Sequence, residues 1–210
     1  MLNPFRSFHR EGAIVGRILV GYSEIEFDLA LCATVAAAVD HDTIIRILYR
    51  LRGEESRFQI ADAIMRPQFN AAELKGGYEE MMSAIRWCKK VRNQYAHSQW
   101  WAEPGQGLFF HDLEKSAKTN SGVTTIEFRH VDVPLLASQE AFLEYADAWA
   151  VYLRDELTLR KGLSDHNGWT APRAMPQPPL HNPPETHRLR YDHWTGLSPE
   201  AEPPDAPPEA

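Results

Sequence analysis

Apolar residues at helical spacing dominate the first seventy positions of the chain. Between residues 11 and 40 they recur every three or four positions, as on the buried side of an amphipathic helix. These positions are Ile14, Ile18, Tyr22, Ile25, Leu29 and Ala33. The stretch "HDTIIRILYRLRG" predicts a second helix, with Asp42 as its N-cap and Gly53 as its stop. The stretch "EESRFQIADAIMR" predicts a third, short helix that Pro67 closes.

A longer helix is predicted from Asn70 to about Trp101. Asn70 with Glu73 three residues later forms a capping-box pattern at its start. Its apolar stripe consists of Tyr78, Met81, Ile85, Cys88, Val91 and Tyr95. Side chains at this spacing share one face of a helix, so we expect the stripe to belong to the core.

Two strands and a last helix are predicted after Pro104, Gly105 and Gly107 break the long helix. The strands are "GLFFHDLE" and "GVTTIEFRHV", and Pro134 ends the second. A lone hairpin is only marginally stable, so we expect it to pack on the helices. Ser138 is expected to cap the last helix, "QEAFLEYADAWAVYLRDELTLRK". One face of this helix carries Phe142, Tyr145, Trp149 and Leu153.

Together these elements predict a mainly α-helical domain over residues 1–163. It is a bundle of four to five helices, with a β-hairpin at 106–133 inserted before the last helix. Residues 164–210 hold eleven of the fifteen prolines, and seven acidic residues against three arginines. We expect this acidic tail to be disordered. Its segment "THRLRYDHWTGL", 186–197, could bind a protein partner, pack back on the domain, or serve as a spacer.

The composition narrows the class of protein. The chain has 210 residues, a net charge of −7 and 43% hydrophobic residues, as expected for one globular domain with additional chain. The apolar run "LALCATVAAAV" is shorter than the ~20 residues of a membrane span. Cys32 and Cys88 fall in apolar helical patterns and suit reduced core thiols. Since the start of the chain shows no secretory signal, we expect a cytoplasmic protein that does not bind membranes.

One basic cluster interrupts this acidic chain. Residues 81–101 contain four basic residues and no acidic one: Arg86, Lys89, Lys90 and Arg92. The cluster ends in "KKVRNQYAHSQWW". Because the C-terminal end of a helix favours positive charge, the cluster has a structural explanation beside a functional one.

The segment "RNQYAH", Arg92 to His97, resembles the Arg-Asn-x-x-x-His signature of the HEPN superfamily. The layout over residues 10–163 is also similar, with the motif late in a long helix and a further helix closing the bundle. A looser Arg-x(4–6)-His spacing recurs at Arg160 to His166 and at Arg188 to His193, but Asn directly follows Arg only at Asn93. Many members of the superfamily are metal-independent endoribonucleases, whereas others bind nucleotides or are structural modules.

The resemblance implies a role for each motif residue in RNA cleavage by the neighbouring 2′-hydroxyl. His97 would act as general base or acid, since imidazole titrates near neutral pH. Arg92 would clamp the phosphate with its planar fork and stabilise charge developing on phosphorus. Asn93 would orient His97 or hydrogen-bond the ribose. The products would be a 2′,3′-cyclic phosphate and a 5′-hydroxyl, and such an enzyme would suit a toxin or a defence effector.

Neighbouring residues extend this predicted RNA site. Arg86, Lys89 and Lys90 would bind phosphates, and Trp100 would stack on a base, with core packing as the alternative for Trp100. The net negative charge predicts weak, salt-sensitive binding to RNA.

Helix geometry adds a constraint on the motif. At about 100° per residue, Arg92 and His97 point about 140° apart around a regular helix. They could meet at one phosphate only through a distorted turn or through a second copy of the motif. The resemblance implies the second arrangement, so catalysis predicts a homodimer whose interface includes residues 92–97.

Other classes of function remain open or are disfavoured. A non-catalytic module could bind a nucleotide or an RNA end through Arg92, Lys89 and Lys90. A helical interaction domain could recruit a partner through residues 186–197. The sequence has no Cys-x-x-Cys or His-Glu-x-x-His ligand set and no glycine-rich phosphate loop, so we expect neither a metal nor another cofactor.

Overall fold

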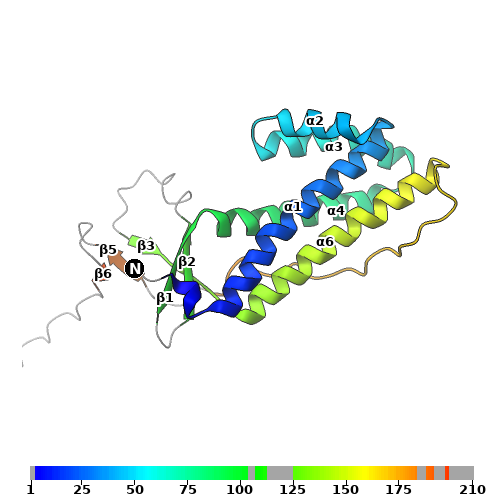
Figure 1. Cartoon of the computed structure of the whole chain (residues 1–210). Coiled ribbons are helices and arrows are strands. Elements are labelled where there is room, and N and C mark those ends of the chain that lie inside the picture. The colour runs from blue at the N-terminus through cyan, green and yellow to red at the C-terminus, as the bar shows by residue number, and fades with distance from the viewer. Residues whose placement is uncertain (1–2, 104–106, 113–124, 184–187, 192–196, 199–210) are drawn as a thin grey trace, which may run out of the picture.

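The computed structural model describes residues 3–103, 107–112, 125–183, 188–191 and 197–198. Within these residues the protein is mainly α-helical, which confirms the predicted fold class (Figure 1). A short 3-10 helix, Pro4–Arg6, precedes five α-helices. They are α1 (His9–Ala37), α2 (His41–Arg50), α3 (Glu54–Ala71), α4 (Lys75–Ala96) and α6 (Val133–Arg160).

Helices α1, α4 and α6 run side by side and enclose the core, and the hairpin of α2 and α3 packs against the end of α1 far from the sheet (Figure 1). The predicted apolar stripes of α1 and α4 are buried in full, as expected from their spacing. Gly77 allows α6 to approach α4 closely, because a Cβ there would lie 2.9 Å from the ring of Trp149. Cys32 and Cys88 are free and buried, and burial raises the pKa of each thiol to about 12.

Several predicted helix ends are wrong. Asp40, rather than Asp42, caps α2, because its side chain accepts a 2.9 Å hydrogen bond from the backbone N–H of Thr43. Gly53 does not stop α2 but precedes α3 with a φ of +88°. Pro67 lies inside α3 instead of closing it. Burial of Met65 and Phe69 on either side of Pro67 offsets the hydrogen bond that a proline removes.

The long helix begins at Lys75, not at Asn70. Asn70 belongs to α3, which ends in a Schellman motif with Glu73 in the left-handed region at a φ of +60°. The N–H of Leu74 donates to the carbonyl of Phe69 at 2.8 Å, and the N–H of Glu73 donates to that of Asn70 at 3.1 Å. Because the motif usually has glycine at the position of Glu73, this turn has no recognisable signal in the sequence.

Helix α4 stops at Ala96, and Trp100 and Trp101 lie in a strand that was not predicted from the sequence. This strand, β1 (Ser98–Glu103), pairs antiparallel with β2 (Gly107–Asp112), which pairs antiparallel with β4 (Arg129–Val131). The pairing of Leu108 with Val131 confirms the predicted hairpin. A second small sheet joins β3 (Thr125–Glu127), β5 (Arg188–Tyr191) and β6 (Leu197–Ser198). The rest of the 186–197 segment lies outside the described residues.

Helix α6 starts six residues earlier than predicted, at Val133 and not at Gln139. Asp132, rather than Ser138, caps it by accepting a 2.9 Å hydrogen bond from the N–H of Leu135. Pro134 sits in the first turn, where a missing N–H removes no helical hydrogen bond. On the predicted face of this helix, Phe142, Tyr145 and Leu153 are buried, and Trp149 is partly buried and packs against the core.

Residues 164–183 follow a defined extended path along the bundle, which differs from the predicted disorder (Figure 1). We call them the strap. Two glutamine side chains hold it: Nε2 of Gln94 donates to the carbonyl of Leu180 at 2.8 Å, and Nε2 of Gln139 donates to that of Pro179 at 2.8 Å. The N–H of Asn182 donates to the carbonyl of His130 at 3.0 Å, which joins the strap to β4. The remaining predicted tail lies outside the described residues, apart from β5 and β6.

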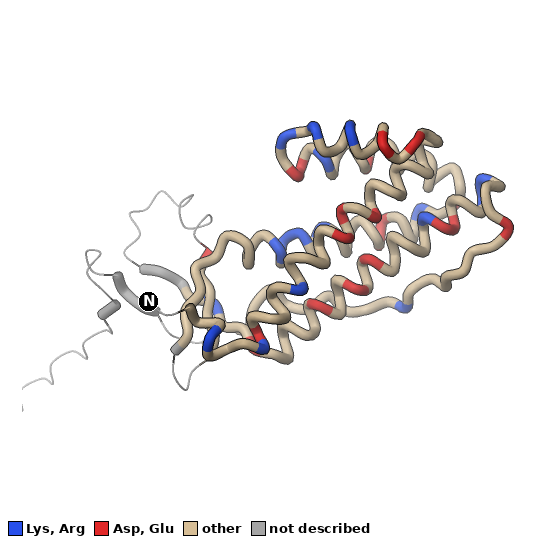
Figure 2. Tube along the Cα trace, viewed as in Figure 1, with Lys and Arg blue, Asp and Glu red and all other residues tan. Residues whose placement is uncertain are grey.

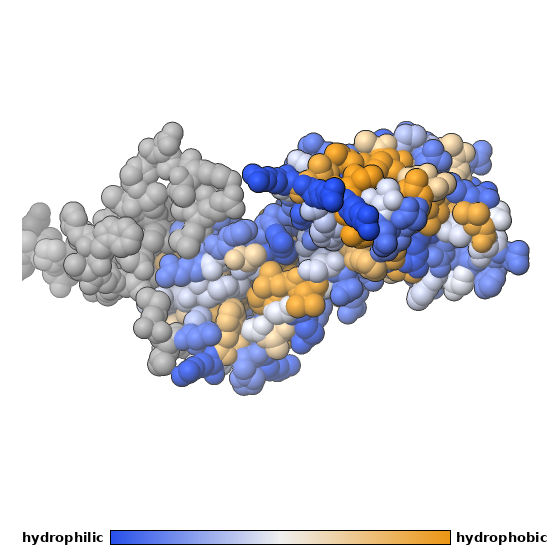
Figure 3. All heavy atoms as spheres, turned by 45° about the horizontal axis from the view of Figure 1, so that its top comes forward, coloured by the Kyte–Doolittle hydropathy of each residue, from blue (hydrophilic) through white to orange (hydrophobic). Residues whose placement is uncertain are grey.

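Apolar side chains also remain on the surface. Figure 3 shows them gathered over α1 and the hairpin of α2 and α3. Among them are Val20, Phe27 and Ile47, of which Val20 is 65% exposed. In the described parts of the chain, no helix is both long and apolar enough to cross a membrane.

We predict that Gln139→Leu loosens the strap and destabilises the fold. Gln139 is 1% exposed and also accepts a 2.6 Å hydrogen bond from the hydroxyl of Tyr95. Because the change leaves buried polar partners unsatisfied, we expect about 2–3 kcal/mol less stability in urea unfolding. Limited proteolysis should cut residues 164–183 faster. The exposed Gln59→Leu is the control, with an expected change within about 0.5 kcal/mol; equal stability of the two variants would contradict the anchoring role.

Candidate functional site

The Arg92–Asn93–His97 motif lies at the C-terminal end of α4, with Arg92 against α1 and α3. Nη1 of Arg92 donates to Oδ1 of Asn93 at 2.6 Å. The same nitrogen lies 3.5 Å from Oε2 of Glu54, which is in the first turn of α3. The guanidinium also sits over the ring of Tyr22 on α1, 5.5 Å from its centroid. Three helices therefore determine where Arg92 lies.

Tyr22 and Glu54 form the back of this site. The Tyr22 hydroxyl donates a 2.6 Å hydrogen bond to Oε1 of Glu54, and Tyr22 is only 1% exposed. Burial, and then the hydrogen bond to Glu54, raise the pKa of Tyr22 well above its ordinary value. Tyr22 is thus a fixed neutral donor and not a base. Neither residue was predicted to belong to the site, because Tyr22 has the spacing of a core residue and Glu54 lies in a different predicted helix.

His97 is exposed and stands at the C-cap of α4. Its backbone N–H donates to the carbonyl of Asn93 at 3.2 Å, so the helix remains regular through the motif. The angle of about 140° between Arg92 and His97 is therefore not removed by a distorted turn. One chain places both residues at the same helix end but does not bring their side chains together.

The basic cluster is only partly free for a ligand. Apart from Lys75 at its start, the basic residues of α4 gather in the half of the helix that leads into the sheet (Figure 2). Nζ of Lys89 lies 2.6 Å from Oε2 of Glu55, and its side chain is 16% exposed. Arg86 is exposed and sits over the ring of Phe58 at 5.0 Å, and Lys90 is exposed. Two adjacent acids at the start of α3 thus compensate Arg92 and Lys89, an effect that counting charges along α4 cannot reveal.

Trp100 lies in an aromatic cluster at the junction of β1 with the bundle. Its ring centroid is 5.1 Å from that of Phe5, 5.3 Å from that of Tyr95 and 5.5 Å from that of Phe110. This is the core packing expected as the alternative to base stacking.

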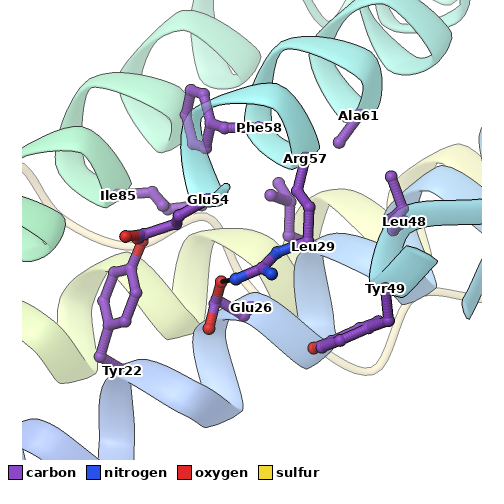
Figure 4. A pocket seen from close by; sticks show the side chains of 10 residues that line it. All are labelled: Tyr22, Glu26, Leu29, Leu48, Tyr49, Glu54, Arg57, Phe58, Ala61 and Ile85. Carbon is purple, nitrogen blue, oxygen red and sulfur yellow. Dashed lines mark hydrogen bonds and ion pairs between the residues drawn. The ribbon is translucent and has the colours of Figure 1, made fainter. Parts of the chain in front are cut away.

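Tyr22 and Glu54 also line a depression that continues toward Glu26, Tyr49 and Arg57 (Figure 4). An ion pair of 3.0 Å between Arg57 and Glu26 crosses it, and Arg57 also sits over the ring of Tyr49. The depression has a volume of about 20 Å³, which is room for roughly one water molecule. In the described residues, no group of three or more His, Cys, Asp or Glu side chains is placed to hold a metal ion.

No protein-family model, curated protein or solved structure matches the chain. The contacts, burial and charge of the motif residues therefore provide the grounds for assigning a function.

A second set of ionisable groups lies between α1 and α6. Oδ1 of Asp147 is buried without a hydrogen-bond partner among the described residues. Arg154 lies 3.1 Å from Asp28, the neighbouring carboxylate. Burial, and then the charge of Asp28, raise the pKa of Asp147 from 3.8 to about 6. The stability of the fold should therefore depend on pH through Asp147 and Asp28, two residues that are not part of the motif.

We predict that Asp147→Asn stabilises the protein at pH 7. Between pH 4 and pH 6 the native state binds more protons at Asp147 than the unfolded chain, so stability falls as pH rises through this range. The variant should abolish that fall. Its free energy of unfolding at pH 7 should exceed that of wild type by about 1 kcal/mol, which is less than the whole pKa difference would give because Asp147 is partly exposed to solvent. Urea unfolding at several pH values measures it, with exposed Asp165→Asn as control. Parallel pH profiles for wild type and Asp147→Asn would contradict the assignment.

We predict that Trp100→Ala acts through stability and not through selective loss of RNA binding. Removing the ring leaves a cavity beside Tyr95 and Phe110, so we expect a loss of about 2–3 kcal/mol in urea unfolding. Trp169, which is 57% exposed, supplies the control Trp169→Ala, with an expected change within about 0.5 kcal/mol. Unchanged stability together with weaker RNA binding would instead place Trp100 in the RNA interface.

Proposed function

We propose that the protein is a metal-independent endoribonuclease that acts as a homodimer. One observation carries the proposal: the strict Arg92–Asn93–His97 set stands at an accessible helix end. The Arg92 side chain is 30% exposed there, and His97 is exposed. The set supplies a phosphate-binding cation and a general base in adjacent helical turns.

The proposed reaction balances without a metal or another cofactor. Neutral His97 of one copy takes the proton of the ribose 2′-hydroxyl, and the 2′-oxygen attacks the adjacent phosphorus. The bond from phosphorus to the 5′-oxygen breaks, that oxygen takes a proton from water, and protonated His97 returns its proton to the solvent. Arg92 stabilises the charge on the phosphoryl oxygens. The products are a 2′,3′-cyclic phosphate and a 5′-hydroxyl.

A second copy is needed because of the geometry of α4. Arg92 and His97 diverge on one regular helix, so a two-fold axis near residues 92–97 would bring the Arg92 of one copy toward the His97 of the other. The neighbouring Lys90 would add attraction for the RNA backbone, whereas the acids of α3 limit it. Binding should therefore be weak and sensitive to salt.

A non-catalytic module that binds a nucleotide or an RNA end is the second candidate. The ion pairs of Arg92 with Glu54 and of Lys89 with Glu55 favour it, because they reduce the charge available for transition-state stabilisation. Binding that depends on Arg92 while RNA stays intact would select this function.

We predict that the purified protein cleaves labelled RNA in the presence of EDTA. His97→Ala and Arg92→Ala should each lower the rate by at least about 100-fold, since each removes one part of the acid–base or electrostatic catalysis. Exposed His166→Ala is the matched control and should cleave at the wild-type rate. Cleavage that survives in His97→Ala would remove His97 from the mechanism.

The dimer can be tested with the same variants. Each Arg92→Ala or His97→Ala homodimer lacks one kind of group, but a mixed dimer retains one arginine and one histidine. Mixing the two inactive variants should restore part of the activity. A wild-type protein that sediments only as a monomer at micromolar concentration, with and without RNA, would contradict the shared site.

A further inference from the structure

The two polar contacts of Arg92 use only one of its guanidinium nitrogens. Nη1 donates to Asn93 and makes the closest approach to Glu54, whereas Nε and Nη2 donate no hydrogen bond to the described residues. Nε and Nη2 form the edge of a guanidinium that binds two oxygens of a phosphate or carboxylate at once.

Two other arginines of this protein use that edge for a neighbouring carboxylate. Arg66 binds Asp62 through Nε at 3.3 Å and Nη2 at 2.9 Å. Arg17 binds Glu140 through the same two nitrogens. Arg92 instead keeps the edge open on a side chain that is 30% exposed.

Glu54 is itself held in place. It follows Gly53, whose φ of +88° turns the chain into α3, and its side chain is 17% exposed. The hydroxyl of buried Tyr22 binds Oε1 at 2.6 Å, which leaves Oε2 to face Nη1 of Arg92. Oε1 thus accepts a hydrogen bond from Tyr22 while Oε2 forms the ion pair with Arg92, and the position of Arg92 follows from α1 and α3 as well as from its own helix.

We infer that Glu54 and Tyr22 are positioning residues that hold Arg92 by Nη1 and present its Nε–Nη2 edge to an RNA phosphate. The identity of the ligand as RNA rests on the proposed function. Glu54 has two opposing effects, because a carboxylate 3.5 Å from the guanidinium orients Arg92 but also repels an incoming phosphate. Glu54 should therefore weaken binding in the ground state while it fixes the orientation that the transition state needs.

We predict that Glu54→Gln separates these two effects. A glutamine amide has one acceptor oxygen but faces two donors, Tyr22 and Arg92, so it cannot hold both. Loss of the negative charge should tighten binding of an uncleavable 2′-O-methyl oligonucleotide about threefold. Loss of orientation should lower kcat on unmodified RNA about tenfold or more. Tyr22→Phe keeps the charge of Glu54 and should lower kcat with unchanged affinity.

Glu55→Gln is the matched control. It removes an adjacent acid whose partner is Lys89 and not Arg92. Affinity should rise as it does for Glu54→Gln, while kcat stays within about twofold of wild type. Unfolding in urea, measured on every variant, identifies any that act through loss of the fold.

The inference is overturned if Glu54→Gln and Tyr22→Phe leave kcat within about twofold, or if affinity, kcat and stability fall together. If wild type binds RNA but leaves it intact, the proposed cleavage is wrong. Binding of the uncleavable oligonucleotide then tests the inference by itself. Binding lost in Arg92→Ala and tightened in Glu54→Gln then supports the presentation of Arg92 to phosphate. Binding that is indifferent to either change overturns it.

Discussion

The buried apolar stripe of α4 is the constraint on which the rest of the site depends. Tyr78, Ile85 and Tyr95 lie against α1, α3 or α6, so α4 cannot rotate about its axis without exposing core side chains. This rotation fixes the direction of every other residue of the helix. Arg92 is directed toward Tyr22 and Glu54, Gln94 toward the strap, and His97 toward solvent at the helix end.

Charge is arranged across helices and not along them. The acids that open α3 lie against the basic residues that end α4, so the basic cluster and its compensation are far apart in the sequence. Such partly exposed pairs add little to stability. Their clearer consequence is geometric, because they direct Nη1 of Arg92 and Nζ of Lys89 toward the protein and leave Nε and Nη2 of Arg92 for a ligand.

A proline-rich segment can be ordered when neighbouring side chains donate hydrogen bonds to its backbone carbonyls, which have no partners in a helix or a sheet. The strap contributes few apolar groups, with Leu180 as the one that packs on the core. The buried amides of Gln94 and Gln139 bind its carbonyls, and Asn182 ties it to β4. Because these amides belong to α4 and α6, the strap links the motif-bearing helix, the last helix and the sheet.

The sequence alone determined the mainly helical class, the buried faces of α1, α4 and α6, the pairing of β2 with β4, and the motif at the end of α4. The helices and their buried faces follow from periodicity, and the strands and the motif follow from residue types in short stretches of chain, so all of these signals are local. The sequence did not reveal the Schellman turn at Glu73, the passage of α3 through Pro67, strand β1 or the strap. At each of these, contacts with distant parts of the chain overrode the local preference. The site divides in the same way. The residue types of Arg92, Asn93 and His97 could be read directly, but the contacts of Tyr22 and Glu54 with Arg92 join three helices. Only the packing of those helices decided which edge of the guanidinium stays open.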